Sequence, residues 1–455
     1  MNCSVDLFRF IPASGTAEPQ AWAASKAAAE APEQWGAAGG AALSREEILH
    51  AARYQFDIWG GGYNWLQGNA LSARDIEDYI ENTILPFYND GKKVEVQGGE
   101  AAPNRIQRHK PLRPAAEQVI IVTHSMGGLV ARALTEIQGY GKVLGVVHGV
   151  QPAAGAPDTY KRMRAGADGI EQLFLGRNAA DLTAILSQAQ GGMELLPTAD
   201  YNHGKPWLKA RDKAVAEEWD TGEGLALPMN GDPYKEIYKS PEWYGLVPRA
   251  NEALMNPGSP EKSWQTGSGD MSGDDNSREA LNDLIDKVKD FHDAIRGKYK
   301  NPTYVFYGDQ GKRGDTGKRG GLFNTGLLAD DDRFAFGQVV WEGPGGGRVG
   351  PKTVLMSDDQ NGRIELVDGT RLRIAQADAP GDGTVPRQSG SAPAGQAGVE
   401  MVFTHGQSGP GSHNEQFGYD HQDACNDERA LYATLYDIIK IAQNAHWHEN
   451  KEESA

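Results

Sequence analysis

One segment of the sequence combines the residue types and the order that catalysis by a serine nucleophile requires. Ser125 stands between a continuous apolar stretch and a stretch with helical spacing, in V-I-I-V-T-H-S-M-G-G-L-V-A-R. A sharp strand-to-helix turn strains the backbone at such a serine and exposes its hydroxyl, provided that the flanking residues are small. Gly127 meets this requirement, whereas Thr123 stands where a glycine is usual. We therefore predict that Ser125 is a nucleophile and that the backbone N–H of Met126 is one oxyanion donor.

A serine hydroxyl becomes a good nucleophile only when a histidine takes its proton and a carboxylate orients that histidine. After a strand–serine–helix turn, the acid and then the histidine are expected further along the chain. Asp382 lies in the turn A-P-G-D-G-T-V-P after an apolar stretch, and we predict that it is the acid. Asp309, close behind an apolar run that ends at Tyr307, is the reserve candidate. An ordinary Asp-Gly turn is the structural alternative for Asp382.

Three histidines follow Asp382 and are candidates for the base. His421, in G-Y-D-H-Q-D, lies in a loop just before the last helical stretch, and we predict that it is the base. His405 ends a predicted strand and could also point at the site. His413 lies in the loop G-P-G-S-H-N-E and is expected to face solvent.

These residues need a framework, and the apolar pattern predicts a mostly parallel sheet of the α/β class. Val119–Val122 is a continuous apolar run, typical of a strand buried on both faces of a parallel sheet, and Val143–Val150 is expected to be a second buried strand. A helical pattern over Met126–Gln138 separates them, which gives a strand–helix–strand unit. Further elements are expected as follows: strands at Thr303–Tyr307 and Glu400–Thr404, a hairpin within Met356–Ala375, and a last helix over Asp423–His446.

The chain divides into four predicted parts. Residues 1–53 are expected to form a loose N-terminal segment. Residues 54–157 and 301–455 should form the two halves of the catalytic core, with the serine in the first half and the acid and histidine in the second. Residues 158–300 are expected to be a large helical insertion, or lid, and a Gly-rich excursion over 308–350 precedes the acid. Six apolar residues of the insertion could line a lid that opens at a lipid surface or could simply pack in a core: Met193, Leu195, Leu196, Trp207, Trp219 and Trp243.

The composition argues against several classes of protein. The 455 residues carry 45 Lys and Arg against 62 Asp and Glu, and the formal net charge of −17 would repel nucleic acid. Cys3 and Cys425 are too few for a disulfide framework or a cysteine-built zinc site. No cofactor or metal is predicted, because neither His421 with Asp423 nor the acidic run Asp330–Asp332 has the spacing of a calcium loop. No apolar run approaches the roughly 20 residues of a membrane helix.

Five short segments carry a resemblance to known lipases. The nucleophile turn of lipases is matched by T-H-S-M-G-G (Thr123–Gly128), their acid turn by G-D-G-T-V-P (Gly381–Pro386) and a histidine loop by Y-D-H-Q (Tyr419–Gln422). The Y-D-W element of lecithin-acyltransferase-like lipases is similar to G-Y-N-W-L-Q (Gly62–Gln67), with Asn in place of Asp. Their G-A-L-E-L-L-P element is similar to G-G-M-E-L-L-P-T (Gly191–Thr198).

Over residues 54–445 the chain thus resembles the lipase effectors of bacterial type VI secretion, notably the group with a DUF3274-type C-terminal region. The resemblance implies an α/β-hydrolase fold and hydrolysis of the acyl esters of membrane glycerophospholipids, through an acyl-enzyme and without a metal. It also implies a cognate immunity protein and a secretion spike or adaptor protein as partners. We expect synthesis in the bacterial cytoplasm without a signal peptide, secretion, and action in the periplasm or envelope of a target cell.

One part of the family pattern is not found. An early strand followed by an H-G oxyanion loop would precede the Trp59 region, and residues 1–53 contain no such segment. The second oxyanion donor is therefore open, with Gly60–Gly62 as the candidate segment. Two other functions also stay open: a cytoplasmic esterase or acyltransferase of the same fold, and a hydrolase-like module without activity that binds a partner or lipid.

Overall fold

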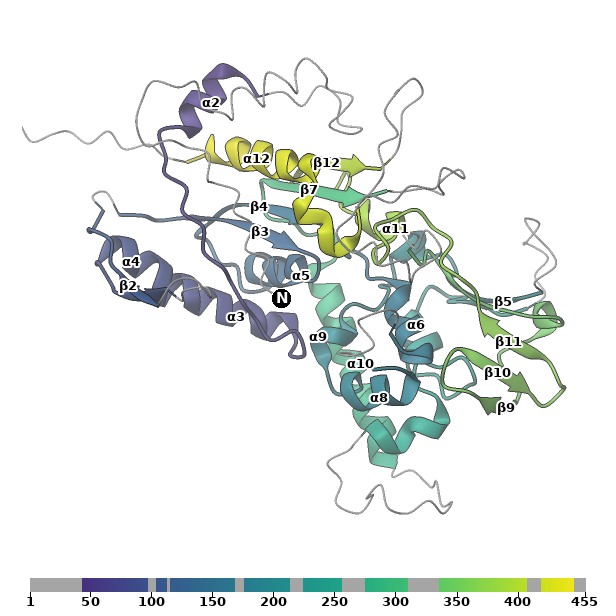
Figure 1. Cartoon of the computed structure of the whole chain (residues 1–455). Helices are drawn as coiled ribbons and strands as arrows, with labels where there is room; N and C mark the ends of the chain where they lie inside the picture. The colour runs from purple at the N-terminus through teal and green to yellow at the C-terminus, as the bar shows by residue number, and fades with distance from the viewer. Residues whose placement is uncertain are drawn as a thin grey trace, which may run out of the picture.

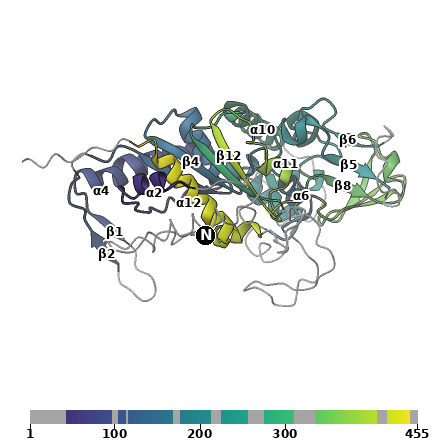
Figure 2. The same ribbon diagram turned by 90° about the horizontal axis from the view of Figure 1, so that it is seen from above.

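The computed structural model describes residues 43–96, 104–112, 115–167, 176–212, 224–255, 275–309, 335–406 and 419–445. Two regions lie side by side in it (Figures 1 and 2). The first is built on a parallel sheet and contains both ends of the described chain, whereas the second contains most of the middle of the chain and a sheet of its own. None of the described helices is both long and apolar enough to cross a membrane.

The parallel sheet has four strands within the described residues, in the order β12–β7–β4–β3. Their bounds are Val119–His124 for β3, Val143–Gly149 for β4, Thr303–Gly308 for β7 and Val399–His405 for β12. Each neighbouring pair is parallel, so the carboxyl ends of the strands meet at one edge of the sheet. The mostly parallel central sheet that the apolar runs predict is confirmed.

The two runs that predict buried strands differ in their surroundings. β4 lies inside the sheet, and its residues Val143, Val146 and Val147 are buried. β3 lies at the edge, and Val122 is 46% exposed. The expectation that β3 is buried on both faces is therefore wrong, because a strand with one neighbour in the described chain receives less cover from the elements around it.

Helices cover both faces of the parallel sheet (Figure 1). Their bounds are Asn69–Tyr79 for α3, Ile80–Ile84 for η2, Leu85–Asn89 for α4, Gly127–Arg132 for α5, Ala133–Ile137 for η3 and Glu428–Ala442 for α12. Val146 packs in a cluster with α3 and α5, and its neighbour Val147 packs in a different cluster with α12. Because successive side chains of a strand point to opposite faces, α3 and α5 cover one face and α12 covers the other.

The end of the predicted loose N-terminal segment forms a helix, α2 (Arg45–Ala51). Ser44 and Glu47 form a capping box, in which each side chain accepts a hydrogen bond from the other residue's backbone N–H. Ile48 is buried in the cluster of α12, and Glu47 pairs with Lys440 of that helix. The local capping signal and the apolar contact with α12 explain why this part is ordered. Residues 1–42 lie outside the described residues.

The second region contains a six-stranded sheet within the described residues, in the order β6–β5–β8–β11–β10–β9. Its strands are Leu208–Arg211 (β5), Ala226–Leu227 (β6), Val339–Glu342 (β8), Leu355–Asp358 (β9), Arg363–Leu366 (β10) and Arg371–Ile374 (β11). β5 and β8 are parallel, and the other neighbours are antiparallel. The insertion is therefore not purely helical, because β5 and β6 join strands that come from much later in the chain.

The predicted hairpin within Met356–Ala375 is a meander of three strands, β9, β10 and β11. Two tight turns explain the third strand. Gly362 in the first turn and Gly369 in the second have positive φ angles of 82° and 85°, which glycine adopts without steric cost. The predicted excursion over 308–350 contains β8, whereas residues 310–334 lie outside the described part of the chain.

Large apolar side chains fill the core of the second region. Four of the six residues that could line a lid are buried there, namely Met193, Leu196, Trp207 and Trp243. Leu195 is half-buried, and Trp219 lies outside the described residues. Their burial indicates core packing in this structure. The helices of this region are α6 (Pro157–Ala165), α8 (Ala179–Leu186), α9 (Gln190–Met193), η5 (Tyr201–Gly204), η6 (Tyr234–Tyr238), η7 (Arg249–Met255) and α10 (Asp275–Ile295).

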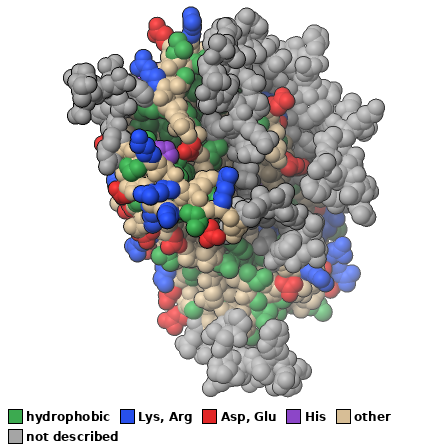
Figure 3. Space-filling model, turned by 60° about the vertical axis from the view of Figure 1, so that its left-hand side comes forward, with side chains coloured by type: hydrophobic (Ala, Val, Ile, Leu, Met, Phe, Trp, Pro, Cys, Tyr) green, Lys and Arg blue, Asp and Glu red, His purple; other side chains and the backbone are tan. Residues whose placement is uncertain are grey.

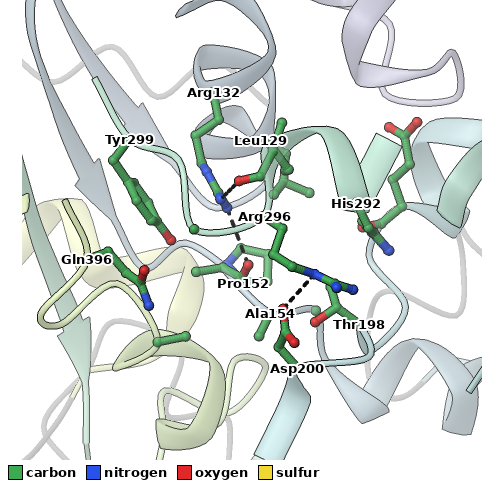
Figure 4. Close-up of a pocket in the computed structure, with 16 residues that line it drawn as sticks. Leu129, Arg132, Pro152, Ala154, Thr198, Asp200, His292, Arg296, Tyr299 and Gln396 are labelled. Carbon is green, nitrogen blue, oxygen red and sulfur yellow. Dashed lines mark hydrogen bonds and ion pairs between the residues drawn. The ribbon is translucent and has the colours of Figure 1, made fainter. Parts of the chain in front are cut away.

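A buried arginine joins the two regions. Arg132, in α5, donates hydrogen bonds to the carbonyls of Ile295 and Lys298 at the end of α10, and its guanidinium lies 4.2 Å from the ring centroid of Tyr299. Figure 4 shows Arg132 and Tyr299 beside a cavity, with the ion pair between Arg296 and Asp200 nearby. Because its guanidinium is matched by carbonyl acceptors, Arg132 has a structural role as a cap of α10.

A short hairpin projects beyond α4 and consists of β1 (Val94–Val96) and β2 (Arg105–Gln107). Figure 3 shows basic side chains gathered on this side of the molecule, although the chain as a whole is acidic. Five exposed cations lie on or next to the hairpin: Lys92, Lys93, Arg105, Arg108 and Lys110. In the chain, the hairpin comes before the amino end of β3, whereas Ser125 comes directly after the carboxyl end of β3.

Candidate active site

Ser125 occupies a strained turn at the carboxyl end of β3. Its φ angle is 55°, in the left-handed region that costs an ordinary residue about 1–2 kcal/mol. The backbone N–H of Ser125 donates to the carbonyl of Gly149 at 2.9 Å, which ties the turn to the end of β4. Met126 and α5 follow directly. The turn has the strand–serine–helix geometry that the sequence predicts, and the serine is half-buried.

Thr123 fits this turn although a glycine is usual in its place. A Cβ placed on Gly127 would lie 3.6 Å from the Cβ of Thr123, an ordinary contact distance. The Thr123 hydroxyl lies 3.0 Å from Nδ1 of His148, a buried histidine whose pKa burial lowers to about 3. The crowded glycine is instead Gly128, where a Cβ would come within 2.6 Å of the side chain of Gln151.

The structure brings Ser125, His421 and Asp382 together in one chain of hydrogen bonds. The Ser125 hydroxyl lies 2.7 Å from Nε2 of His421, and Nδ1 of His421 lies 2.8 Å from Oδ2 of Asp382. Asp382 is 1% exposed and His421 is 5% exposed, so water competes little for these bonds. This is the arrangement in which a carboxylate holds the histidine with Nδ1–H towards the acid and Nε2 towards the serine.

Two features aim the carboxylate of Asp382. Its Oδ1 accepts hydrogen bonds from the backbone N–H groups of Thr384 at 3.0 Å and Val385 at 2.7 Å, which leaves Oδ2 for His421. The residue also packs against the end of β7, where a Cβ on Gly308 would lie 2.8 Å from the Cβ of Asp382. Only glycine leaves room at the end of β7 for the acid turn.

The reserve candidates lie elsewhere in the hydrogen-bond network. Asp309 pairs with Arg387, and burial raises the pKa of Asp309 although Arg387 opposes the shift. His405 is buried with Nδ1 3.1 Å from the hydroxyl of Tyr419, and burial lowers its pKa to about 3. His413 lies outside the described residues. Of the candidate histidines in the described chain, His421 is the one that contacts Ser125.

The backbone N–H of Met126 is available as an oxyanion donor. It is the cap residue of α5, and its N–H donates to no acceptor within the described residues. Tyr63, from the G-Y-N-W-L-Q element, reaches the same turn: its hydroxyl would lie 3.8 Å from a Cβ on Gly127. Burial raises the pKa of Tyr63 to about 12. The role of Gly60–Gly62 as the second donor stays a prediction.

The chain was compared with protein families, curated proteins and solved structures to find which proteins it is similar to. No family model and no curated protein matches the chain. A solved chain from the crystal structure of the Tle4–Tli4 complex is similar, with 38% sequence identity and a TM-score of 0.74. The similarity covers 97% of this chain and 79% of that chain. The protein belongs to the type VI secretion lipase effectors.

Two elements of the resemblance, G-Y-N-W-L-Q (Gly62–Gln67) and G-G-M-E-L-L-P-T (Gly191–Thr198), contact each other beside the nucleophile turn. Gly191 lies so close to the G-Y-N-W-L-Q segment that a Cβ would come within 2.2 Å of the carbonyl oxygen of Gln67. Glu194 accepts hydrogen bonds from the backbone N–H of Asn69 at 2.8 Å and from its side-chain amide at 2.7 Å. Gln190 donates to the other carboxyl oxygen at 2.8 Å. Glu194 thus accepts the hydrogen bond of the first backbone N–H of α3, the helix that follows G-Y-N-W-L-Q.

The sequence predicts the three residues of the hydrogen-bond chain, but it does not indicate the roles of Glu194 and His124. Glu194 lies within a recognised element, yet its role depends on the backbone of α3, which no local pattern reports. His124 stands directly before the nucleophile, and its Nε2 lies 2.8 Å from the carbonyl oxygen of His421. Its position next to Ser125 was the one signal available in the sequence.

The calcium alternatives of the sequence have no support in the described residues. No group of three or more His, Cys, Asp or Glu side chains in this part of the chain is arranged to hold a metal ion. His421 has both ring nitrogens engaged with Asp382 and Ser125. The acidic run at 330–332 lies outside the described residues.

Proposed function

We propose that this effector is a serine phospholipase that hydrolyses the acyl esters of membrane glycerophospholipids. The observation that carries the proposal is the continuous hydrogen-bond chain from Ser125 through His421 to Asp382 at a strained strand-to-helix turn. Its geometry supports acyl transfer, and membership of the lipase effectors favours a lipid ester as the substrate. In this proposal the enzyme belongs to the carboxylic ester hydrolases.

The proposed reaction follows from the positions of the donors and acceptors. His421 Nδ1–H donates to Asp382, so Nε2 is free to take the proton of the Ser125 hydroxyl as its oxygen attacks the ester carbonyl. The Met126 N–H stabilises the oxyanion that forms. His421 then returns the proton to the leaving alcohol, and an acyl-enzyme remains on Ser125. Water, activated by the same histidine, releases the fatty acid and restores the serine.

The partners and the place of action form part of the same proposal. The solved relative is described as a complex of Tle4 with Tli4. By analogy we infer that this chain binds a cognate immunity protein, which protects the producing cell, and that a secretion spike or adaptor protein carries it. The substrate would then be met in the periplasm or envelope of a target cell.

The test compares the native protein with Ser125→Ala on phospholipid vesicles whose two acyl chains carry different labels. We expect the native protein to release fatty acid and the variant to lose this release, while both proteins keep the same melting temperature. Equal release by both proteins would rule out Ser125 as the nucleophile. Cleavage of short soluble esters without release from vesicles would instead support the esterase alternative.

A further inference from the structure

Two hydrogen bonds hold the main chain of His421, one from the segment of the acid and one from the segment of the nucleophile. Its N–H donates to the backbone carbonyl of Asp382 at 2.8 Å, so one anchor comes from the acid turn. Its carbonyl oxygen lies 2.8 Å from Nε2 of His124, so the other anchor comes from the strand that carries the nucleophile. The anchors matter because His421 lies in a short 3-10 turn, η9 (His421–Asn426), rather than inside a long element.

We propose that His124 is a positioning residue, which holds His421 in line with Ser125 by donating a hydrogen bond to the backbone carbonyl of His421. The proposal rests on the proposed function, in which His421 is the base. His124 is the last residue of β3, where it pairs with Gly149 of β4, and it directly precedes Ser125. The distance between base and nucleophile is thereby set by two adjacent residues at the end of one strand.

The hydrogen bond determines the proton on His124. A carbonyl oxygen only accepts, so Nε2 of His124 must carry the hydrogen. Burial lowers the pKa of His124 from its ordinary value, and a positive charge on His421 lowers it further, while the hydrogen bond to the His421 carbonyl and the charge of Asp382 raise it. The net lowering of the pKa favours the neutral ring, in which Nε2 still carries the donor hydrogen. A cation at this place would oppose the imidazolium that His421 becomes during catalysis, since the two ring centroids are only 5.0 Å apart.

Loss of this bond should affect the chemical step rather than substrate binding. The Ser125 hydroxyl and His421 Nε2 are 2.7 Å apart, within the narrow range for proton transfer. A misplacement of about 1 Å can cost on the order of 100-fold in rate. Without the His124 donor, the His421 carbonyl would lose its contact with β3. His421 would then be held only from the acid turn, by the bond from its ring to the Asp382 carboxylate and by the bond from its backbone N–H to the Asp382 carbonyl.

Two variants separate the hydrogen bond from packing. His124→Phe keeps an aromatic ring beside His421 but removes the donor, whereas His124→Gln offers an amide N–H at nearly the same reach as Nε2. We expect His124→Phe to lower kcat on a short soluble ester by about 10- to 100-fold with an unchanged KM. His124→Gln should recover most of that loss. The rate at which a fluorophosphonate probe labels Ser125 should fall and recover in parallel, and melting temperatures should stay close to that of the native protein.

The outcomes are distinct. Equal losses of rate in His124→Phe and His124→Gln would overturn the proposal, because the hydrogen-bond donor would then have no effect of its own. Native rates in both variants would also overturn it. If His124→Phe does not fold, His124→Asn takes its place, because the shorter amide does not reach the His421 carbonyl. Probe labelling also separates this proposal from the proposed function: a native protein that is labelled at Ser125 yet inert on every ester tested would contradict the hydrolase function alone.

Discussion

The two regions of the molecule place their functional groups in different ways. In the parallel-sheet region, strands end at one edge in tight turns, and the strained Ser125 and the crowded Gly308 both lie there. In the six-stranded region, the chain buries large side chains such as Trp207 and Trp341 in a continuous core. The first region gathers hydrogen-bonded polar side chains at one edge of its sheet, and the second spreads apolar contacts over a wide interior.

Much of the sequence between the nucleophile and the acid belongs to the second region, first between β4 and β7 and again after β7. After β7 ends at Gly308, the chain leaves the parallel-sheet region, builds strands β8 to β11 of the second region and returns. On its return, Asp382 packs against the end of β7. The excursion therefore adds a packed unit to the fold without moving the acid from the edge where Ser125 and His421 lie. Substitutions at the edge should alter activity, and substitutions in the second core should alter stability.

The largest expected effect is at the edge, from Asp382→Asn. An asparagine oxygen can still accept from Thr384 and Val385, but its amide would face Nδ1 of His421 and favour the wrong tautomer. We expect kcat to fall by about 10⁴-fold with little change in melting temperature. Kinetics on a short ester with thermal unfolding would measure both. The matched control is Asp309→Asn, which breaks the pair with Arg387 and should leave activity within about 10-fold. Equal losses in the two variants would contradict the assignment of the acid.

The second region should respond in the opposite way. Trp207→Ala removes a fully buried ring, and we expect a loss of about 3–5 kcal/mol in the free energy of unfolding. Activity per folded molecule should stay within a few-fold of the native value at low temperature. Urea unfolding and active-site titration would test this. Val354→Ala, at a side chain that is 63% exposed, is the control and should change stability by less than about 0.5 kcal/mol. A variant that stays fully stable but loses its activity would contradict the division of roles.

The smallest effect concerns Glu194, whose hydrogen bonds to Asn69 form a second contact between the two regions beside that of Arg132. Burial raises the pKa of Glu194 from 4.5 to about 7, although Asn69 and Gln190 oppose the shift. Because the folded protein binds this proton more tightly than the unfolded chain, the stabilisation is fully present below pH 4.5 and is lost as pH rises through about 7. The change is on the order of 3 kcal/mol. Glu194→Gln, which cannot ionise, should flatten stability between pH 5 and 8 in urea titrations; an unchanged pH dependence would assign the effect to another group.

The sequence alone carried the local part of this picture. Apolar stretches predicted the strands at Val119 and Val143, and the small residue Gly127 after Ser125 predicted a sharp turn into a helix. The order of the serine, Asp382 and His421 along the chain also came from the sequence. The strands and the turn depend on side-chain size, backbone strain and periodicity within about ten residues, so they can be predicted without knowledge of the fold.

Only the tertiary structure decided which groups meet. Ser125 and His421 are 296 residues apart, and the loop position that favours His421 over His405 in the sequence does not show that either residue reaches the serine. The edge position of β3 and the six-stranded sheet of the second region were not predicted, because pairing between distant strands leaves no period in the sequence. The bond from His124 to the His421 carbonyl has the same origin. The types of the proposed catalytic side chains can be read from short segments of the sequence, whereas the distances between these side chains are set by packing between remote parts of the chain.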